Sequence, residues 1–567
     1  MKEPTRPIPQ PTVDRDGSLV AHTVATPTAF KVRAKVTIGS RKVIPVIFVP
    51  GIMGSNLRAR GDMTVRKDDI LRPGEAAWRP PNGSVDGYRE AARWEYRSPS
   101  MRQRILDPGI LEVDPGGELD MPFCALDTGV MRERGWGEVH ASSYGALLVD
   151  LQRHLDRTFQ VSPYGIRQVR HYWKRVMQCE AERWGVRSVE NVTEAELERY
   201  AAYQYPVYAF GYNWLESCSE SARRLRTRID QIKRFWTERK HECHRVILVT
   251  HSMGGLVARA CARLSGTGDD SNSDIAGIIH AVMPALGAPV AYRRIACGTE
   301  GGNFTNGLRD NIKAAKFAEI AGETSAKTTP VMAVAPGALQ LLPNHLYPKP
   351  WLVIKMIRGA NGRDDVRDMV SLPDGSAYDL YRDMDSWYRM IDPGLADPSH
   401  RYGRKNGSVR KIILQAINEA ERFHTEVLMD TPSNGSSKPY YHPNTYAFYG
   451  ADKSLKSYGQ VRWVARMPSS SSAVLTPANI RKGKFLGYDA GGARQVEIEG
   501  GLRLSFTVWP QDANGDETVP TQSSAAPEKY IRQSFPSAGF RHQDCFSHED
   551  MLLLTRHLIV KIVQDVR

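Results

Sequence analysis

The sequence has 567 residues, of which 41% are hydrophobic and 25% are charged. That composition is typical of a folded globular protein and excludes disorder over most of the chain. Lysine and arginine number 76 and aspartate and glutamate 63, so the net charge is +13, an excess that suits anionic lipid surfaces or nucleic acid but is more simply interpreted as a solvated basic surface. The basic residues are dispersed among acidic ones, without a stacking or groove-reading motif, which argues against nucleic-acid binding.

The cysteines and the N-terminal composition indicate the compartment in which the chain folds. Seven cysteines are scattered along the sequence without a Cys-x-x-Cys pair, which argues against a disulfide framework or a zinc site. The N-terminal residues are polar and rich in proline, and they lack the apolar stretch of a secretory signal. No run approaches the roughly 18 consecutive apolar residues of a membrane span. We therefore expect synthesis without a signal peptide and folding in a reducing cytoplasm.

Apolar runs and helical patterns alternate in the first half of the chain. Residues 43–49 form a β-branched apolar run that stops at Pro50-Gly51, as expected of a buried strand. The predicted elements that follow it are strand 207–212, helix 222–235, strand 245–249, helix 256–261 and strand 275–282. This alternation predicts an α/β fold, with a mostly parallel sheet flanked by helices.

The elements divide the chain into four predicted parts. Residues 1–40 form an N-terminal arm, and residues 41–290 form the first part of the core, with an irregular insertion at 58–140. Residues 291–500 mix amphipathic helical pieces with loops and are predicted to form a cap or lid. Residues 501–567 return to the core with a strand and a closing helix.

A serine lies at the junction between a predicted strand and a helix, in Thr250-His251-Ser252-Met253-Gly254. A tight turn there exposes the hydroxyl at the carboxyl end of the sheet, and the helix N-terminus behind it stabilises a developing oxyanion. Thr250 replaces the first glycine of the Gly-x-Ser-x-Gly pattern. The strand and the helix nevertheless favour Ser252 as a nucleophile over a mere N-cap, and His251 is expected to point away from the reaction centre.

An acyl-transfer site also needs backbone N–H groups for the oxyanion, an acid and a histidine. Glycines around Met53 allow a tight loop after the first strand, so the amides of Met53 and Met253 are the predicted oxyanion hole. Asp516 follows the predicted strand at 502–509 and is the predicted acid; the residues around it fit a calcium loop poorly. His548 immediately precedes the last helix and is the predicted base, with His542 as the alternative.

These motifs together resemble the lecithin–cholesterol acyltransferase and GPI-inositol-deacylase branch of the α/β-hydrolases. The matching segments are Val49-Pro50-Gly51-Ile52-Met53-Gly54-Ser55, Tyr212-Asn213-Trp214, His251-Ser252-Met253-Gly254-Gly255 and Gly515-Asp516-Glu517-Thr518-Val519-Pro520, with His548 last. The resemblance implies a Ser252–Asp516–His548 triad, Met53 as an oxyanion donor and an α/β-hydrolase fold with large cap insertions. The mechanism that the resemblance implies requires no metal and no organic cofactor.

Within that branch the chain looks most like the bacterial lipase effectors of type VI secretion. Such effectors are made in the cytoplasm, are carried by the secretion apparatus into the periplasm of rival cells and hydrolyse membrane phospholipids there. The producing cell holds a cognate immunity protein. The resemblance therefore implies a serine phospholipase with a membrane substrate, an immunity partner and a carrier. Two alternatives stay open: transfer of the acyl chain to an alcohol, and a hydrolase-like binding module without catalysis.

Overall fold

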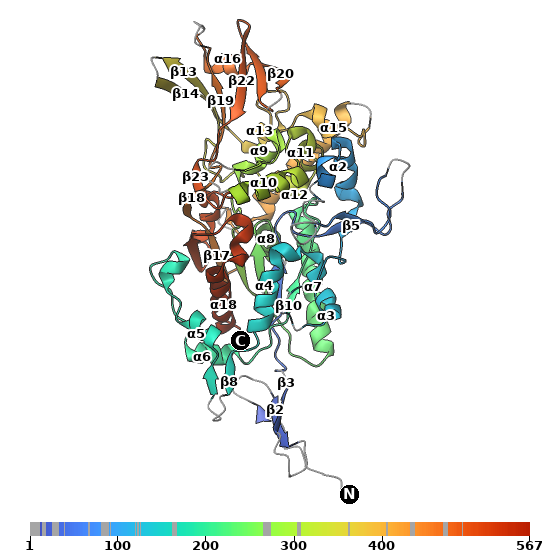
Figure 1. Cartoon of the computed structure of the whole chain (residues 1–567), viewed down its shortest axis with the longest axis vertical. Coiled ribbons are helices and arrows are strands. Elements are labelled where there is room, and N and C mark those ends of the chain that lie inside the picture. Colours follow the sequence, from blue (N-terminus) through green and yellow to red (C-terminus); the bar gives the residue numbers. More distant parts are fainter. Residues whose placement is uncertain are drawn as a thin grey trace.

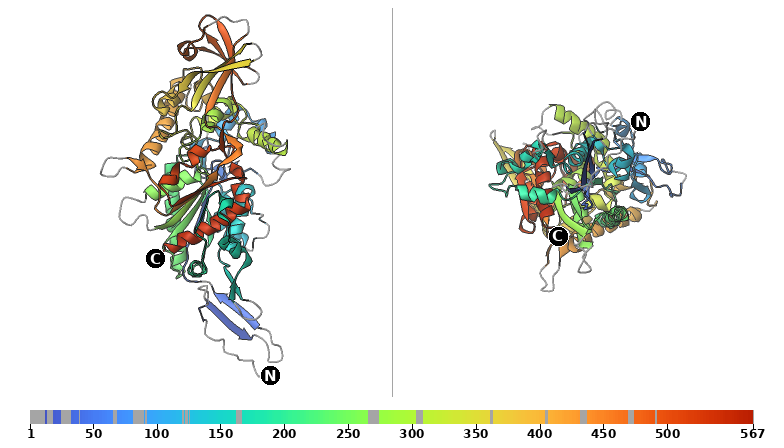
Figure 2. Two further views of the ribbon diagram at one scale, coloured as in Figure 1. Left: turned by 90° about the vertical axis from the view of Figure 1, so that its left-hand side faces the viewer. Right: turned by 90° about the horizontal axis from the view of Figure 1, so that it is seen from below.

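The computed structural model describes most of the chain and shows an elongated molecule (Figure 1). It describes residues 12–13, 19–24, 33–38 and 40–566, apart from gaps at 66–68, 81–89, 91, 120, 122–123, 125, 162–166, 265–273, 303–307, 361–362, 404–405, 431–436, 469–473 and 490–491. The α/β core occupies the middle, with the N-terminal strands at one end and a second sheet at the other, as Figure 2 also shows.

The core is a six-stranded parallel sheet in the order β10-β4-β11-β12-β17-β24. Its strands are β4 (Val46–Val49), β10 (Val207–Ala209), β11 (Val246–His251), β12 (Ile275–Ala281), β17 (Thr445–Gly450) and β24 (Gln533–Ser537). Every residue of the first five is buried. This is the burial expected of parallel strands covered on both faces, and it confirms the predicted α/β fold.

Helices cover both faces of the core sheet, and neighbouring residues of one strand belong to different hydrophobic clusters. Ile247 and Val249 pack with α4 (Ala141–His154) and α18 (Glu549–Gln564). Val246 and Leu248 pack with α7 (Cys218–Glu238) and α8 (Gly254–Leu264). Successive side chains of a strand point to opposite faces, so one apolar run contributes to both halves of the core.

The boundary predicted between cap and core is wrong in two places. Strand β17 (Thr445–Gly450) lies inside the predicted cap but pairs with β12 and β24 in the core sheet. The predicted core strand at 502–509 is β22 (Leu502–Val508), which lies instead in a second sheet of order β14-β13-β19-β22-β21-β20. Its exposed and buried residues alternate, as in a strand with one solvated face, whereas β17 is buried throughout. The cap is therefore two insertions, on either side of β17.

The two cap insertions build a helical layer beneath the second sheet (Figure 1). The sheet consists of β13 (Leu352–Ala360), β14 (Arg363–Leu372), β19 (Val461–Arg466), β20 (Lys484–Tyr488), β21 (Arg494–Ile498) and β22. The helices are α9 (Pro289–Cys297), α10 (Leu308–Ala321), α11 (Ser325–Met332), α12 (Pro336–Leu339), α13 (Ala377–Arg382), α14 (Pro393–Ala396) and α15 (Asn406–Arg422). Apart from α10, these helices share one hydrophobic cluster with the sheet, so the cap has a core of its own.

The remaining segments carry short elements. In the predicted arm, β1 (Thr12–Val13), β2 (Leu19–Val24) and β3 (Arg33–Ile38) pair antiparallel. The irregular insertion contains β5 (Leu57–Ala59), β6 (Ala76–Trp78), β7 (Leu111–Val113), α2 (Pro99–Ile105) and α3 (Thr128–Glu133). Within the described part of the chain, no helix is both long enough and apolar enough to cross a membrane.

Candidate active site

Ser252 occupies a strained turn between β11 and α8. Its φ of +51° lies in the left-handed region, which residues with a side chain adopt rarely. A Cβ on Gly254 would lie 2.4 Å from the carbonyl oxygen of Val49, so this position requires glycine. Thr250 is buried where the usual pattern has glycine, and its hydroxyl shares a 2.9 Å hydrogen bond with Nδ1 of His280 on β12. The threonine is thus accommodated without changing the turn.

A continuous hydrogen-bonded chain joins Ser252, His542 and Asp516. Ser252 Oγ lies 2.8 Å from Nε2 of His542, and Nδ1 of the same ring lies 2.8 Å from Oδ2 of Asp516. Asp516 is fully buried, and its other oxygen accepts hydrogen bonds from the backbone N–H groups of Thr518 and Val519, at 3.0 and 2.7 Å. These bonds hold the carboxylate in the orientation that faces the imidazole.

The structure corrects the preference for His548 over His542. His548 is the N-cap residue of α18, and its nearest acidic oxygen is Oδ2 of Asp550, 4.0 Å from its Nδ1. A 3₁₀ turn, η7 (His542–Ser547), separates the two histidines, so the side chain that reaches the serine is at the start of this turn. A charge pattern in the sequence could have indicated His542 as the base, because the basic Arg541 precedes it and the acidic Glu517 follows Asp516. The ion pair between Arg541 and Glu517, 3.1 Å long, lies directly beside the His542–Asp516 pair.

The loop after β4 carries Met53, one of the two residues whose backbone amides were predicted to form an oxyanion hole. Met53 has a φ of +61°, and its carbonyl accepts a 2.9 Å hydrogen bond from the indole of Trp78, which fixes the orientation of the loop. A Cβ on Gly51 would lie 3.0 Å from Cβ of Ser252, so the loop approaches the serine closely. Within the described part of the chain, the amides of Met53 and Met253 donate no hydrogen bond; Met53 is partly exposed, whereas Met253 is fully buried.

His251 was expected to point away from the site, and this expectation is wrong. Its ring connects the oxyanion loop to His542 through hydrogen bonds. Its Nε2 lies 2.9 Å from the carbonyl oxygen of His542, and its Nδ1 lies 3.1 Å from the hydroxyl of Tyr144. A carbonyl only accepts, so Nε2 carries the proton and Nδ1 accepts from Tyr144. Tyr144 accepts in turn from the backbone N–H of Gly51, at 3.2 Å. Burial lowers the pKa of His251 to about 3, so this ring stays neutral.

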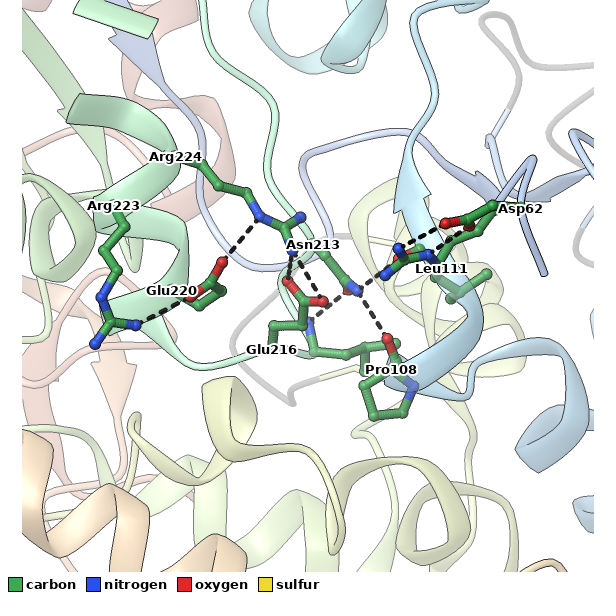
Figure 3. Close-up of polar contacts among 10 residues, drawn as sticks. Asp62, Pro108, Leu111, Asn213, Glu216, Glu220, Arg223 and Arg224 are labelled. Atoms are coloured by element: carbon green, nitrogen blue, oxygen red, sulfur yellow. Dashed lines mark hydrogen bonds and ion pairs between the residues drawn. The ribbon is translucent and has the colours of Figure 1, made fainter. Parts of the chain in front are cut away.

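The Tyr212-Asn213-Trp214 segment supports the site without reaching it. The Tyr212 hydroxyl donates a 2.9 Å hydrogen bond to the carbonyl of Pro50, in the oxyanion loop. The Asn213 side chain donates to the carbonyls of Pro108 and Leu111, as Figure 3 shows, at 3.2 and 3.3 Å. Trp214 packs edge-on against Trp78, with ring centroids 5.5 Å apart. These residues join the irregular insertion to the oxyanion loop.

A cavity of about 500 Å³ opens above Ser252 and combines a polar floor with apolar walls. Its floor holds Ser252, His542 and Asp516 together with the loop at Met53. The walls come mainly from the cap helices α9, α10 and α11, and include Val290, Ile295, Phe317, Ile320 and Met332. This arrangement suits a reactive polar group that is attached to a long apolar chain.

Among the residues that the structure describes, no group of three or more His, Cys, Asp or Glu side chains is arranged to hold a metal ion. Asp512, part of the segment considered as a calcium loop, accepts hydrogen bonds from the backbone N–H groups of Gly459 and Gln460. Its carboxylate thereby anchors the loop between β18 (Asp452–Ser457) and β19.

Comparisons with known proteins identify similar sequences and folds. Residues 208–337 match the family model of the PGAP1-like alpha/beta domain. A chain of the crystal structure of the Tle4–Tli4 complex is 27% identical, with a TM-score of 0.70 over 92% of this chain and 99% of that one. The phospholipase PlaB from Legionella pneumophila is 10% identical over 58% of this chain and 85% of that one, with a TM-score of 0.14, too low to indicate a shared fold. No curated protein matches the sequence significantly.

Proposed function

We propose that this chain, an α/β-hydrolase of the GPI-inositol-deacylase-like branch, is a serine lipase that hydrolyses acyl esters of membrane phospholipids. The main support is the arrangement of Ser252, His542 and Asp516 in hydrogen-bond contact at the floor of a largely apolar cavity. The order of these residues along the chain, serine then acid then histidine, is the order of α/β-hydrolase triads.

In this proposal each group has a defined step. Nε2 of His542 removes the proton of Ser252 as the serine oxygen attacks the ester carbonyl. Asp516 stabilises the imidazolium that forms, and the amides of Met53 and Met253 stabilise the oxyanion. His542 then gives its proton to the departing alcohol oxygen, which leaves an acyl-serine. Water, deprotonated by the same imidazole, attacks the acyl-serine and releases the fatty acid.

The charge distribution around the serine supports this chemistry. Helix α8 begins at Gly254, and its N-terminus directs the positive end of the helix dipole at the oxyanion position. The neutral ring of His251 holds the backbone of His542 without placing a second positive charge beside the imidazolium. The surroundings therefore favour the negative charge on the oxyanion and the single positive charge on His542.

The test is fatty-acid release from phospholipid vesicles by the purified full chain beside Ser252→Ala. We expect release by the wild type, none above background by the variant, and labelling of Ser252 by a fluorophosphonate probe in the wild type alone. Labelling without release would remove phospholipid as the substrate. Full activity in Ser252→Ala would refute the serine mechanism. Adding a sterol or lysolipid to the same assay separates hydrolysis from transfer to an alcohol.

We further propose that the enzyme is an effector of type VI secretion that is blocked by a cognate immunity protein. The supporting observation is the similarity over 92% of this chain to a chain of the Tle4–Tli4 complex. The proposal predicts that the wild type directed to the periplasm of a bacterial host stops growth and that Ser252→Ala does not. Equal growth with both proteins would contradict the antibacterial role without affecting the lipase assay.

A further inference from the structure

A second cavity, of about 300 Å³, lies against α8, the helix that follows Ser252. Arg259 of α8 lies at this cavity, seven residues after Ser252, and none of the described residues that line it also lines the catalytic cavity. Most of its wall is apolar or aromatic: Leu286, Leu346, Leu428, Met429, Tyr441 and Tyr530. Its volume is at the lower end of the range of small-molecule sites, about 300 to 1,000 Å³.

Arg259 brings a buried positive charge to this cavity. The residue is only 2% exposed. Its Nε donates to the carbonyl of Tyr440 at 3.1 Å and its Nη2 to that of Leu428 at 3.2 Å, while the guanidinium lies 3.9 Å from the centre of the Tyr441 ring. In the described part of the chain, Nη1 makes no hydrogen bond and no carboxylate pairs with this side chain. Burying a cation without an anionic partner is costly, so the cavity favours an anion.

The polar neighbours of Arg259 do not neutralise its charge. His424 lines the same cavity, but its nitrogens are engaged by the Tyr378 hydroxyl, at 3.0 Å, and the Gln340 carbonyl, at 2.8 Å. Burial lowers the pKa of His424 to about 4, and the positive charge of Arg259 adds to that effect. Glu528 and Lys529 are exposed on the rim, in η6 (Ala526–Lys529), and carry opposite charges.

A second arginine of the same helix shows the difference that an acidic partner makes. Arg263 lies one turn beyond Arg259, and its Nε donates to the carbonyl of Met429 at 3.3 Å, an environment similar to that of Arg259. Its side chain is 33% exposed and lies 3.9 Å from the carboxylate of Asp430. Arg263 does not line the cavity. Thus the more accessible Arg263 has a carboxylate partner, whereas the buried Arg259 lacks one among the described residues.

We propose that the second cavity binds a small organic carboxylate with an aliphatic body, such as a short fatty acid. The carboxylate accepts hydrogen bonds from Nη1 of Arg259, a charge-assisted contact that suits the planar guanidinium. The aliphatic body packs against Leu286, Leu346 and Met429. This binding site is separate from the proposed catalysis and does not depend on it.

The probe is octanoate, titrated calorimetrically into the full chain, with 1-octanol as its uncharged counterpart. We expect a saturable site for octanoate that persists when Ser252 carries a fluorophosphonate adduct in the catalytic cavity, and at least tenfold weaker binding of octanol to that site. Arg259→Gln should weaken octanoate binding about tenfold or more, whereas the matched variant Arg263→Gln should bind like the wild type. Ser252→Ala should also bind like the wild type, so failure of the catalytic proposal does not alter this result.

A second variant covers the case in which Arg259→Gln does not fold. Leu346 is 41% exposed at the cavity, so Leu346→Trp should fill it from the surface while leaving Arg259 in place. We expect this variant to lose octanoate binding and to keep the wild-type melting temperature within a few degrees. Equal binding of octanoate by Leu346→Trp and the wild type, or equal binding of octanol and octanoate, would overturn the proposal.

Discussion

The two six-stranded sheets of this chain differ in how completely their strands are buried. Core strands such as β12 are buried along their whole length because helices cover both faces, whereas β22 alternates because one face meets solvent. The proposed site uses loops after the core strands β4, β11 and β24, together with Asp516, which follows the short strand β23 (Ala513–Gly515) outside the core sheet. None of the described residues that line the catalytic cavity comes from the second sheet. Chemistry is thus concentrated where parallel strands end, and the second sheet supports the cap that closes the cavity.

The largest expected effect separates the two histidines that follow the last core strand. His542→Ala should lower kcat by a factor of at least about 10⁴, because the serine then has no base. His548→Ala should change kcat by less than about threefold, because His548 lies outside the hydrogen-bonded chain. Turnover of a soluble ester measures both, with circular dichroism as the check of folding. The reverse ranking would restore the assignment that the sequence favoured.

This pair also shows how far sequence reasoning reaches. The elbow, the oxyanion loop and Asp516 each follow a local pattern that a fixed geometry requires, so Ser252 and Met53 could be located without a structure. The choice between His542 and His548 depends on one 3₁₀ turn, and the opposite charges of Arg541 and Glu517 indicate His542 only when two segments distant in the sequence are compared. The boundary of the cap failed for a different reason. Residues 502–508 alternate apolar with polar side chains, a pattern that indicates a strand with one solvated face and not a fully buried core strand.

The next prediction compares how two glycine substitutions change the free energy of unfolding. One glycine is at the start of α8 in the core, and the other is in the cap. Gly254→Ala should lower the free energy of unfolding by about 2 kcal/mol or more, because the added Cβ meets the backbone carbonyls of Val49 and Pro50. Gly375→Ala, between β14 and α13, meets nothing within 4 Å and should change stability by less than about 1 kcal/mol. Urea unfolding of both variants tests the contrast, and equal losses would contradict it.

Acid should destabilise the core through its buried histidines. Burial lowers the pKa of His251 and of His280 to about 3, so below pH 6.5 the unfolded chain binds protons that the folded chain does not. Stability therefore falls as the pH drops from about 6.5 towards 3, by up to about 1.4 kcal/mol per pH unit for each ring. Unfolding free energies at pH 7, 6 and 5 measure the slope. His280→Gln should flatten it by about the contribution of one ring, and an unchanged slope would refute this source.

The smallest expected effect tests the connection between the oxyanion loop and the triad. Tyr144→Phe removes the hydroxyl that links the backbone N–H of Gly51 to Nδ1 of His251, and leaves both groups buried without their partner. Such a loss is worth about 1–3 kcal/mol, so we expect kcat to fall about tenfold with little change in KM.

The matched control for this prediction lies in the cap. The hydroxyl of Tyr381, also buried, donates a 2.6 Å hydrogen bond to the carbonyl of Pro343, outside the catalytic cavity. Tyr381→Phe should lower stability by a similar amount and leave kcat unchanged. If both variants lose stability and neither loses kcat, Tyr144 only supports the fold. A loss of kcat confined to Tyr144→Phe would show that the hydrogen bonds from Gly51 through Tyr144 to His251 position the groups that react. The core and the cap would then differ in function as well as in sheet architecture.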